Sequence, residues 1–249
     1  MDDEEIVYGL HAVSALFEHG RPVSRVWAQE TRHDARFEAL LDLAEARGIP
    51  VERVPREELD ELADHGSHQG IVVVAGTIKA GGDDALKDLV TGLSKPAFLL
   101  VLDGVQDPYN LGACLRSANA AGVNAVIVPK DRAAGLTAGA RKAASGTTEM
   151  TPFFQVTNLV RTLRWLKQQN IWLVALSGEA EQTLYEIDLK GPLALVLGAE
   201  GTGLRRLTKE HCDFLVRIPM VGAVESLNVS VAAGIALFEA LRRRRVKHA

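Results

Sequence analysis

The fold is decided by the stretch FLLVLDGVQDPYNLGACLRSANAAGVNAVIV, which runs from Phe98 to Val128. It opens on a continuously apolar segment, Phe98–Leu102, and closes on another, Ala125–Val128. The residues Asn110–Ala121 between them are predicted to form a helix. Because strands that are apolar on both faces must be buried on both faces, this pattern predicts a parallel sheet covered by helices on either side.

The same alternation continues to the end of the chain. Further strands are expected at Ile171–Leu176, Leu193–Leu197 and Phe214–Ile218. Further helices are expected at Thr137–Ala144, Asn158–Gln168 and Asn228–Arg244. The last helix carries apolar residues at helical spacing, namely Val231, Ile235, Phe238 and Leu241.

The first 78 residues repeat the α/β alternation with shorter elements. Helices are expected at Tyr8–Glu18, Ala35–Arg47 and Arg56–Ala63, and strands at Arg25–Ala28, Val51–Val54 and Gly70–Ala75. This pattern predicts a small α/β domain over residues 1–78, with the apolar run IVVVA as its central strand. Residues 79–95, which include a Gly-Gly pair, are expected to be a linker to a larger domain over residues 96–249.

Charge is distributed unevenly between these two parts. The net charge of the 249-residue chain is −4, which by itself argues weakly against a nucleic-acid partner. Residues 1–78 hold 7 Arg and no Lys against 16 acidic residues, a net of −9, whereas the remainder has a net of +5. The asymmetry favours two domains with different roles. Chance variation in solvated faces explains it equally well.

Other features narrow the class of protein. Cys114 and Cys212 lie far apart without metal-ligand spacing, so we expect small buried residues in a reduced, cytoplasmic protein and no metal site. The N-terminus MDDEEIVYGL is acidic and lacks the apolar segment of a signal peptide. No apolar run approaches the ~20 residues that span a bilayer, so no membrane partner is expected.

The loops that follow the buried strands are the expected place for a ligand, because open α/β sheets bind ligands beyond the carboxyl ends of their strands. The first such turn, Asp103–Gly112, has no G-x-G-x-x-G dinucleotide fingerprint. The turn GAEGTG, Gly198–Gly203, is not a P-loop either, because Leu204 stands where a lysine is needed. Its glycines still permit close backbone approach to a ligand.

Five polar side chains lie in or next to three of these loops. They are Asn110, Arg116, Glu200, Ser226 and Asn228. Each has an ordinary explanation on its own: Asn110 and Asn228 are suitable helix caps, and Arg116 is a suitable surface residue. Their joint occurrence at strand ends of one domain predicts a site.

Three motifs resemble those of the SpoU branch of the SPOUT methyltransferases, in the same order and spacing. They are NLGACLRSA (Asn110–Ala118), LVLGAEGTGL (Leu195–Leu204) and IPMVGAVESLNVSVAAGIALFEA (Ile218–Ala240). The resemblance extends from Pro96 to the C-terminus. IVYGLHAVSALFE (Ile6–Glu18) and HQGIVVV (His68–Val74) resemble the L30e-like RNA-binding domain of those members that methylate a guanosine ribose in the peptidyl-transferase loop of bacterial 23S ribosomal RNA.

The resemblance implies a deep trefoil knot whose loops bind S-adenosylmethionine. It assigns the cofactor to the backbone of Leu197, Gly198, Ile218, Met220 and Leu227, with Gly201 permitting close approach. Leu176, Thr147 and Ser226 are weaker flanking candidates. No metal is implied.

The resemblance also implies methyl transfer to a ribose 2′-hydroxyl, with Arg116 as the essential residue. Since an arginine pKa above ~12 makes a free guanidine scarce, we favour Arg116 as an anchor for the substrate phosphate and hydroxyl over a general base. Glu200 is expected to pair with Arg116 and hold it. Asn110 and Asn228 are expected to orient the ribose, with support from Ser226.

The expected partners are 23S ribosomal RNA and a second copy of the chain, and not DNA, which lacks the 2′-hydroxyl. The apolar stripe of the last helix fits a dimer interface or packing within its own chain. A domain with a net of −9 is unusual for RNA binding. Local basic groups remain as candidates, namely Arg21, Arg25, Arg32, Arg36, His11 and His68. His68 is equally well explained as a structural histidine.

Three alternatives remain open. The first is a 2′-O-methyltransferase with another target, either transfer RNA or a ribosomal adenosine whose methylation confers antibiotic resistance. The L30e-like N-terminus disfavours the transfer-RNA enzyme. The second is a non-catalytic ribosome-assembly factor, against which the intact polar residues argue. The third is a generic nucleotide-binding enzyme, which the absence of both a Rossmann fingerprint and a P-loop turn argues against.

Overall fold

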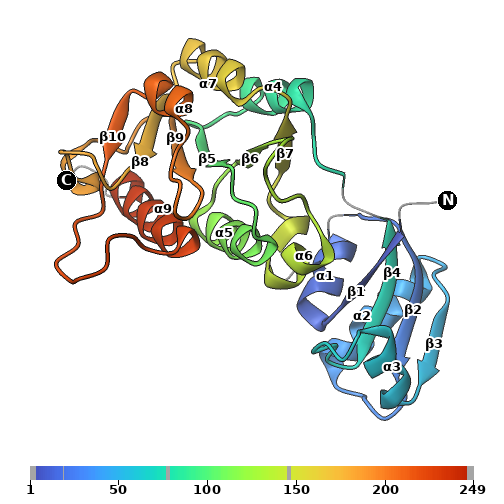
Figure 1. Cartoon of the computed structure of the whole chain (residues 1–249). Helices are drawn as coiled ribbons and strands as arrows, with labels where there is room; N and C mark the ends of the chain where they lie inside the picture. Colours follow the sequence, from blue (N-terminus) through green and yellow to red (C-terminus); the bar gives the residue numbers. More distant parts are fainter. Residues whose placement is uncertain (1–3, 19, 77–78, 145–146, 246–249) are drawn as a thin grey trace. The chain divides into compact units, whose positions relative to one another are not determined.

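The computed structural model describes residues 4–18, 20–76, 79–144 and 147–245 of the chain (Figure 1). The chain divides into two compact units, Met1–Lys79 and Ala80–Ala249. Each unit has its own sheet and its own hydrophobic core.

The first unit is built on a mixed sheet of four strands. Its strand order is β1 (Glu4–Tyr8), β4 (Ile71–Gly76), β2 (Val23–Gln29) and β3 (Val51–Val54). Strand β4 runs antiparallel to both of its neighbours, and β2 and β3 are parallel. The apolar run IVVVA is therefore a central strand, as predicted, whereas β1 was not predicted because its acidic start hides the strand pattern.

Three helices cover the two faces of this sheet. Helices α1 (Leu10–Glu18) and α2 (Ala35–Ala46) pack on one face with Ile71, Val73 and Ala75. Helix α3 (Arg56–Leu62) packs on the other face, where Leu59 meets Val72. Successive residues of a strand point to opposite faces, so a strand covered on both sides must be apolar throughout.

The second unit is built on a parallel sheet of six strands. Its strand order is β10 (Phe214–Val216), β8 (Trp172–Leu176), β9 (Leu193–Gly198), β5 (Phe98–Asp103), β6 (Ala125–Pro129) and β7 (Phe153–Val156). All five pairs of neighbouring strands are parallel. The predicted parallel α/β sheet is confirmed, and β7 is an additional strand.

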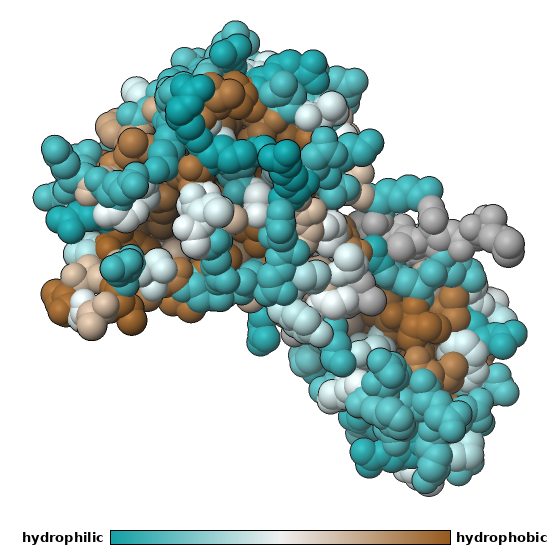
Figure 2. All heavy atoms as spheres, viewed as in Figure 1, coloured by the Kyte–Doolittle hydropathy of each residue, from teal (hydrophilic) through white to brown (hydrophobic). Residues whose placement is uncertain are grey.

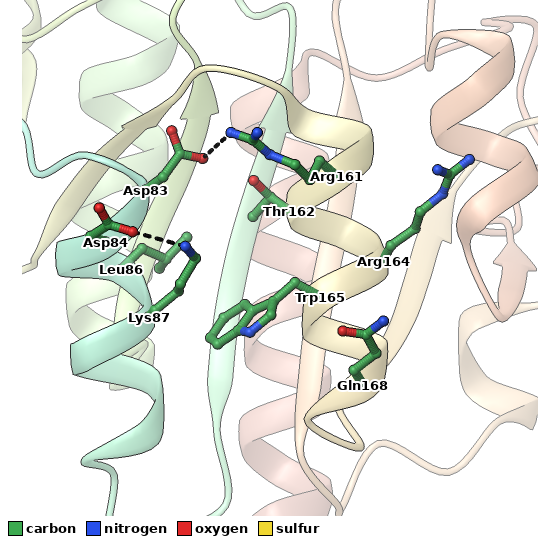
Figure 3. Close-up of a pocket in the computed structure, with 9 residues that line it drawn as sticks. All are labelled: Asp83, Asp84, Leu86, Lys87, Arg161, Thr162, Arg164, Trp165 and Gln168. Carbon is green, nitrogen blue, oxygen red and sulfur yellow. Dashed lines mark hydrogen bonds and ion pairs between the residues drawn. The ribbon is translucent and has the colours of Figure 1, made fainter.

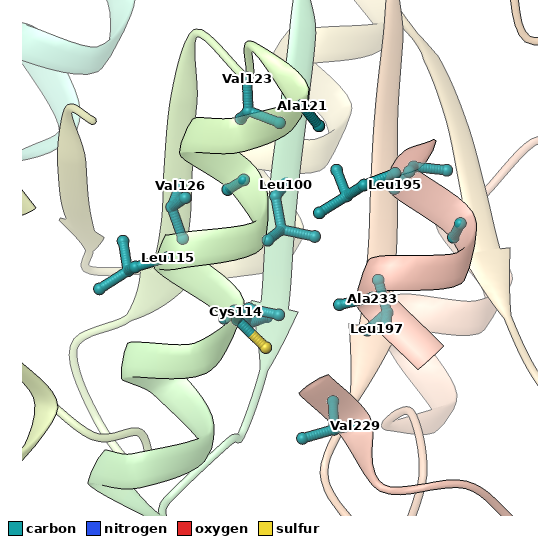
Figure 4. Close-up of a cluster of buried hydrophobic side chains, with 14 of the residues drawn as sticks. Leu100, Cys114, Leu115, Ala121, Val123, Val126, Leu195, Leu197, Val229 and Ala233 are labelled. Atoms are coloured by element: carbon teal, nitrogen blue, oxygen red, sulfur yellow. The ribbon is translucent and has the colours of Figure 1, made fainter. Parts of the chain in front are cut away.

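Helices cover both faces of this sheet (Figure 1). One face carries α5 (Pro108–Ala121), α6 (Ala138–Ala144) and α9 (Val229–Arg245), and Figure 4 shows the apolar side chains that α5 and α9 bury against it. The other face carries α4 (Asp83–Thr91), α7 (Leu159–Gln168) and α8 (Arg206–His211). The short 3-10 helices Thr147–Glu149 and Leu184–Glu186 lie in the connections.

The segment expected to be a linker, residues 79–95, contains α4 and packs into the second unit. Leu86 and Val90 of α4 are buried in the core. The Asp83 carboxylate accepts hydrogen bonds from the Thr157 backbone and hydroxyl at 3.1 and 2.9 Å. The Gly-Gly pair does not mark a free linker, because Gly81 forms a parallel bridge to Phe154 beside β7.

No helix in the described parts of the chain is both long and apolar enough to cross a membrane.

Candidate active site

Asn110, Glu200 and Asn228 come from three distant segments and meet in one hydrogen-bonded cluster. Asn110 lies in the first turns of α5, Glu200 in the turn after β9, and Asn228 directly before α9. The Asn228 side-chain amide donates to Asn110 Oδ1 at 2.9 Å and to Glu200 Oε1. The sheet thus brings together one residue from each of the three motifs.

Glu200 is the centre of this cluster. Its Oε1 also accepts a hydrogen bond from the Val229 backbone N–H, at 3.2 Å, in the first turn of α9. Asn228 Oδ1 in turn accepts from the backbone and hydroxyl of Ser230, at 2.9 and 2.6 Å. Asn228 therefore caps α9, as one interpretation expected, and it also bridges the three motifs; its role at the reacting ribose stays a prediction.

Arg116 and Ser226 lie outside the cluster. The expected Arg116–Glu200 ion pair does not form, because the Glu200 carboxylate is bound by Asn228 and the backbone of α9. Arg116 is exposed on α5 and makes no hydrogen bond or ion pair within the described parts of the chain. The Asn110 position inside α5 also differs from a cap, since Asp107 caps that helix. Ser226 is exposed beside a pocket.

That pocket, with a volume of ≈570 Å³, opens between the turn after β9 and the segment after β10. It includes all six residues that the sequence assigns to the cofactor, and also Leu176, Glu200 and Ser226. Thr147 does not line it; its hydroxyl instead donates to the Ala144 carbonyl at 2.7 Å. The six residues expected at the cofactor, all of which line this pocket, are Leu197, Gly198, Gly201, Ile218, Met220 and Leu227.

Gly198 is required by the shape of the pocket wall. A Cβ at this position would lie 2.1 Å from the Gly203 carbonyl carbon and 2.3 Å from the Leu204 nitrogen. The chain folds back on itself here, with an antiparallel bridge between Ala199 and Gly203. Gly201 and Gly203 adopt φ values of +76° and +65°, which L side chains rarely adopt. The wall is therefore a tight backbone turn without bulky side chains, which suits close approach by a flat ligand.

Asp103, which was not predicted as a site residue, holds the end of this turn through Arg205. Its side chain is fully buried at the end of β5 and binds both the backbone and the guanidinium of Arg205. The available signal was an acidic residue directly after the apolar run FLLVL. A carboxylate in that position is costly unless it is paired.

Cys114 is buried, as expected, whereas Cys212 is only half-buried and its thiol donates to the Thr208 carbonyl. Burial, together with the nearby negative charge of Glu200, raises the pKa of Cys114 to about 12. Burial likewise raises the pKa of Cys212 to about 12. Both thiols stay protonated at neutral pH. No group of three or more His, Cys, Asp or Glu residues suited to a metal ion occurs among the described residues.

A second cavity, of ≈640 Å³, lies between α4 and α7 on the opposite face of the sheet (Figure 3). Figure 2 shows apolar surface bordered by hydrophilic residues beside these two helices. Its acidic groups are already matched within the chain, since Asp84 pairs with Lys87 at 2.8 Å and Asp83 faces Arg161 at 3.8 Å. None of the residues predicted for the site lines this cavity.

In the first unit, two of the six basic candidates are committed to structure. Arg21 pairs with Glu5 and donates to the Gly76 carbonyl. His68 is buried, with its Nε2 3.0 Å from Asp60 Oδ1 and its Nδ1 accepting from the Gly70 backbone at 3.0 Å. The structural interpretation of His68 therefore holds.

The other four candidates are at least partly exposed. The Arg36 Nη2 lies 3.0 Å from His11 Nδ1. Arg32 pairs with Asp34 at 2.5 Å and donates to the Gln69 carbonyl at 2.6 Å, and the Gln69 side chain accepts from the Leu10 backbone at 3.1 Å. These contacts place His11, Arg32 and Arg36 at one end of the first unit. Arg25 lies apart from them over the Trp27 ring.

Both units match known protein families. Residues 97–238 match the SpoU rRNA Methylase family, and residues 6–78 match the RNA 2′-O ribose methyltransferase substrate-binding domain. The chain belongs to the SpoU rRNA methylase family. This confirms the predicted family and the α/β fold class, and the six-stranded parallel sheet is the catalytic SpoU fold.

SpoU relatives share about half of the residues over nearly the whole chain. The 23S rRNA (guanosine-2′-O-)-methyltransferase RlmB of Pseudomonas aeruginosa is 54% identical over 98% of this chain and 98% of its own length. The protein of the same name from Escherichia coli K12 is 52% identical over 96% of this chain and 99% of its own length.

Solved SpoU-type structures share the fold over both units. The crystal structure of an RNA 2′-O ribose methyltransferase superposes with a TM-score of 0.80 at 28% identity, covering 98% of this chain and 90% of that one. An AdoMet-bound rRNA methyltransferase from Sinorhizobium meliloti gives a TM-score of 0.80 at 25% identity, covering 98% of this chain and 89% of that one.

Proposed function

We propose that this chain transfers a methyl group from S-adenosylmethionine to the ribose 2′-hydroxyl of a guanosine in 23S ribosomal RNA. The observation that carries the proposal is the Asn110–Asn228–Glu200 cluster beside a pocket walled by glycine turns. Relatives that are about half identical over nearly the whole chain bear that activity in their names.

The pocket fits the cofactor by its shape and its donors. The backbone of Leu197, Ile218 and Leu227 would hold the adenine and ribose, and the small Gly198 and Gly201 leave room beside the turn. Met220 lines the pocket at its open side, where it is 36% exposed. When bound, S-adenosylmethionine supplies a methyl group on a sulfonium whose positive charge disperses during transfer.

The residues of the chain have two tasks in this reaction, which are to align the ribose and to stabilise its oxygen. Asn110 and Asn228 present amide groups from a rigid frame, because Glu200 fixes Asn228 to the start of α9. Such fixed positions reduce the entropic cost of bringing the reacting atoms together. Ser226 borders the pocket on the same side.

Arg116 is the group that activates the 2′-hydroxyl in this proposal. Its guanidinium has no partner within the described parts of the chain and is exposed, so it is available to an RNA phosphate and to the reacting oxygen. A permanent positive charge there stabilises the negative charge that grows as the hydroxyl loses its proton. Because Glu200 does not pair with it, the full charge of Arg116 acts on the substrate.

A homodimer is the second part of the proposal. The buried face of α9 consists of Val229, Ala233, Ala236, Leu237 and Ala240. Of the predicted stripe, Val231 and Phe238 are each 49% exposed. These two large apolar residues stand seven positions apart, on one side of the helix, and a second copy of the chain would cover them.

The remaining assignments follow from the substrate class. The first unit, residues 1–78, serves to bind RNA, and the 2′-hydroxyl excludes DNA as a substrate. We propose that the protein acts in the bacterial cytoplasm, where large-subunit RNA is made. The trefoil knot that the family resemblance implies belongs to the same proposal. The chain after β10 lies beside residues 182–184, where the Arg217 N–H donates to the Gln182 carbonyl and the Leu184 N–H donates to the Arg217 carbonyl.

Mapping of 2′-O-methylation in ribosomal RNA tests the proposed function. The protein is expressed in a strain without its own enzyme for the peptidyl-transferase guanosine, and methylation is read as reverse-transcription stops at low nucleotide concentration. We expect a new stop at that guanosine, absent with Arg116→Ala. A stop at another nucleotide reassigns the substrate. No stop in any RNA, together with no cofactor binding by calorimetry, contradicts the proposal.

A further inference from the structure

Asp103 is the only carboxylate among the fully buried polar side chains in the described ranges of the chain. It ends β5, where it lies next to Gly198 in the parallel register of β5 and β9. Removing a carboxylate from water carries a large cost unless strong partners replace the lost hydration. The partners of Asp103 therefore indicate what this position is for.

Both oxygens of Asp103 bind the same residue, Arg205. Oδ2 accepts the Arg205 backbone N–H at 3.2 Å, and Oδ1 accepts the guanidinium Nε at 2.6 Å, with a further ion pair to Nη2. Backbone and side chain are thus held at once, which fixes the position of Arg205 and also its orientation. Arg205 is also the N-cap residue of α8, which begins at Arg206.

Arg205 closes the turn that forms the wall of the cofactor pocket. The turn leaves β9 at Gly198, carries Glu200 and returns at Leu204. Its first end is held by the pairing of Gly198 with β5, and its last end by the Asp103–Arg205 pair. Both ends are therefore attached to the same strand, β5, and the glycines between them provide no stiffness of their own.

We infer that Asp103 and Arg205 are positioning residues for the cofactor turn. They hold residues 199–204 in the conformation that binds S-adenosylmethionine and present Glu200 to Asn228. Among the described residues, Asp103 makes no hydrogen bond to Asn110 or Asn228. Asp103 therefore acts on that cluster only through the turn. The inference rests on the proposed function, because it assumes that this pocket binds the cofactor.

The test uses Asp103→Asn, which keeps the volume and one acceptor oxygen but removes the charge. S-adenosylhomocysteine binding is measured by calorimetry on the full chain, and hydrogen exchange of residues 199–204 is measured without ligand. We expect the Kd to rise about 10-fold to 100-fold, as for small displacements of a binding group, with faster exchange in the turn. The KM for RNA should stay unchanged.

Asp213→Asn is the matched control. Asp213 is also a largely buried carboxylate that accepts a backbone N–H, from Leu173 at 2.9 Å, and pairs with a cation, Lys167 at 2.6 Å. It does not line the cofactor pocket. Asp213→Asn should lower the Tm as Asp103→Asn does, but leave the Kd for S-adenosylhomocysteine within about twofold of the unsubstituted protein.

Two results would overturn the inference. One is that Asp103→Asn lowers the Tm while its Kd and its exchange in residues 199–204 match those of the control. If Asp103→Asn does not fold, Arg205→Lys is used in its place. A lysine keeps the positive charge but loses the paired contact of Nε and Nη2 with Asp103 Oδ1. Normal cofactor affinity in that variant is the second result. If the unsubstituted protein does not bind S-adenosylhomocysteine, the proposed function itself fails.

Discussion

The two units use the same α/β alternation but place their polar residues differently. In the second unit every strand of the sheet is parallel, so all carboxyl ends meet at one edge and three distant motifs converge there. In the first unit β4 runs antiparallel to β1 and β2, and β3 is parallel to β2, so the carboxyl ends of β1, β2 and β3 lie at one edge and that of β4 lies at the other. The second sheet therefore gathers six carboxyl ends at one edge, whereas the first sheet has three at one edge and one at the other.

The charged side chains of the two units also differ in their partners. The cluster around Glu200 shares hydrogen bonds among three motifs, while three basic side chains of the first unit, Arg21, Arg32 and Arg53, pair with nearby acids. The second unit should therefore depend steeply on single residues, and the first unit should depend on the sum of several weak contacts.

Arg116→Ala should lower kcat/KM for RNA by about 1,000-fold, because it removes a charge aimed at the transition state. The Kd for S-adenosylhomocysteine should not change, since Arg116 does not line the pocket. Single-turnover methylation and calorimetry measure the two quantities. Arg161→Ala, on α7 far from the motifs, is the control and should be fully active. A tenfold or smaller loss with Arg116→Ala would show that the group is not essential.

Gly198→Ala should weaken cofactor binding by more than about tenfold, because overpacking displaces the backbone it meets. The new methyl group would lie 2.1 Å from the Gly203 carbonyl carbon. Gly191→Ala is the control, as nothing lies within 4 Å of a Cβ there. Calorimetry and thermal unfolding are the measurements. Equal affinities for the two variants would mean that the turn adapts freely.

Phe238→Asp should convert a dimer into a monomer at micromolar concentration, because it places a charge at the centre of the exposed stripe of α9. Val231 and Phe238 are each 49% exposed in the single chain, so the monomer should keep its Tm within a few degrees. Sedimentation velocity distinguishes the two states. Glu210→Lys, on exposed α8, is the control. An unsubstituted protein that sediments as a monomer would refute the dimer.

Arg36→Ala should weaken RNA binding only severalfold and reduce the salt dependence of log Kd by about one unit of slope, the signature of a single phosphate contact. Arg36 is exposed, and among the described residues His11 is its one side-chain partner. Binding of a 23S fragment is measured over a salt series. Arg47→Ala, which removes a guanidinium placed over Phe17, serves as the control. If both variants behave alike, this end of the unit does not contact RNA.

Some of the site was readable from residues alone. Buried strands can be recognised in the sequence as apolar runs. The polar residues that follow them must lie at one edge of the sheet if the sheet is parallel. Asn110, Glu200 and Asn228 were predicted in this way, and they do lie within hydrogen-bonding distance. The expected Arg116–Glu200 ion pair does not form. The sequence indicates which charged residues lie at one edge of the sheet, but it does not indicate which of them come within hydrogen-bonding distance of each other.

The elements that were missed have a common physical reason. Strand β7 is only four residues long, and α4 begins at a Gly-Gly pair that is typical of linkers. Both become regular structure because they pack on each other: Gly81 bridges to Phe154, and Asp83 binds Thr157. Tertiary contacts of this kind override weak local preference.

Residue order alone was enough to identify the class of the protein, which is a parallel α/β unit with three SpoU motifs after a smaller acidic α/β unit. Hydrophobic periodicity and motif spacing are properties of the residue order, so they can be recognised in the sequence. Three features became visible only in the folded chain: Glu200 binds Asn228 instead of Arg116, Asp103 binds Arg205 at the end of the 199–204 turn, and α9 leaves Val231 and Phe238 exposed. Those outcomes depend on distances between residues far apart in the chain, which folding sets and spacing does not.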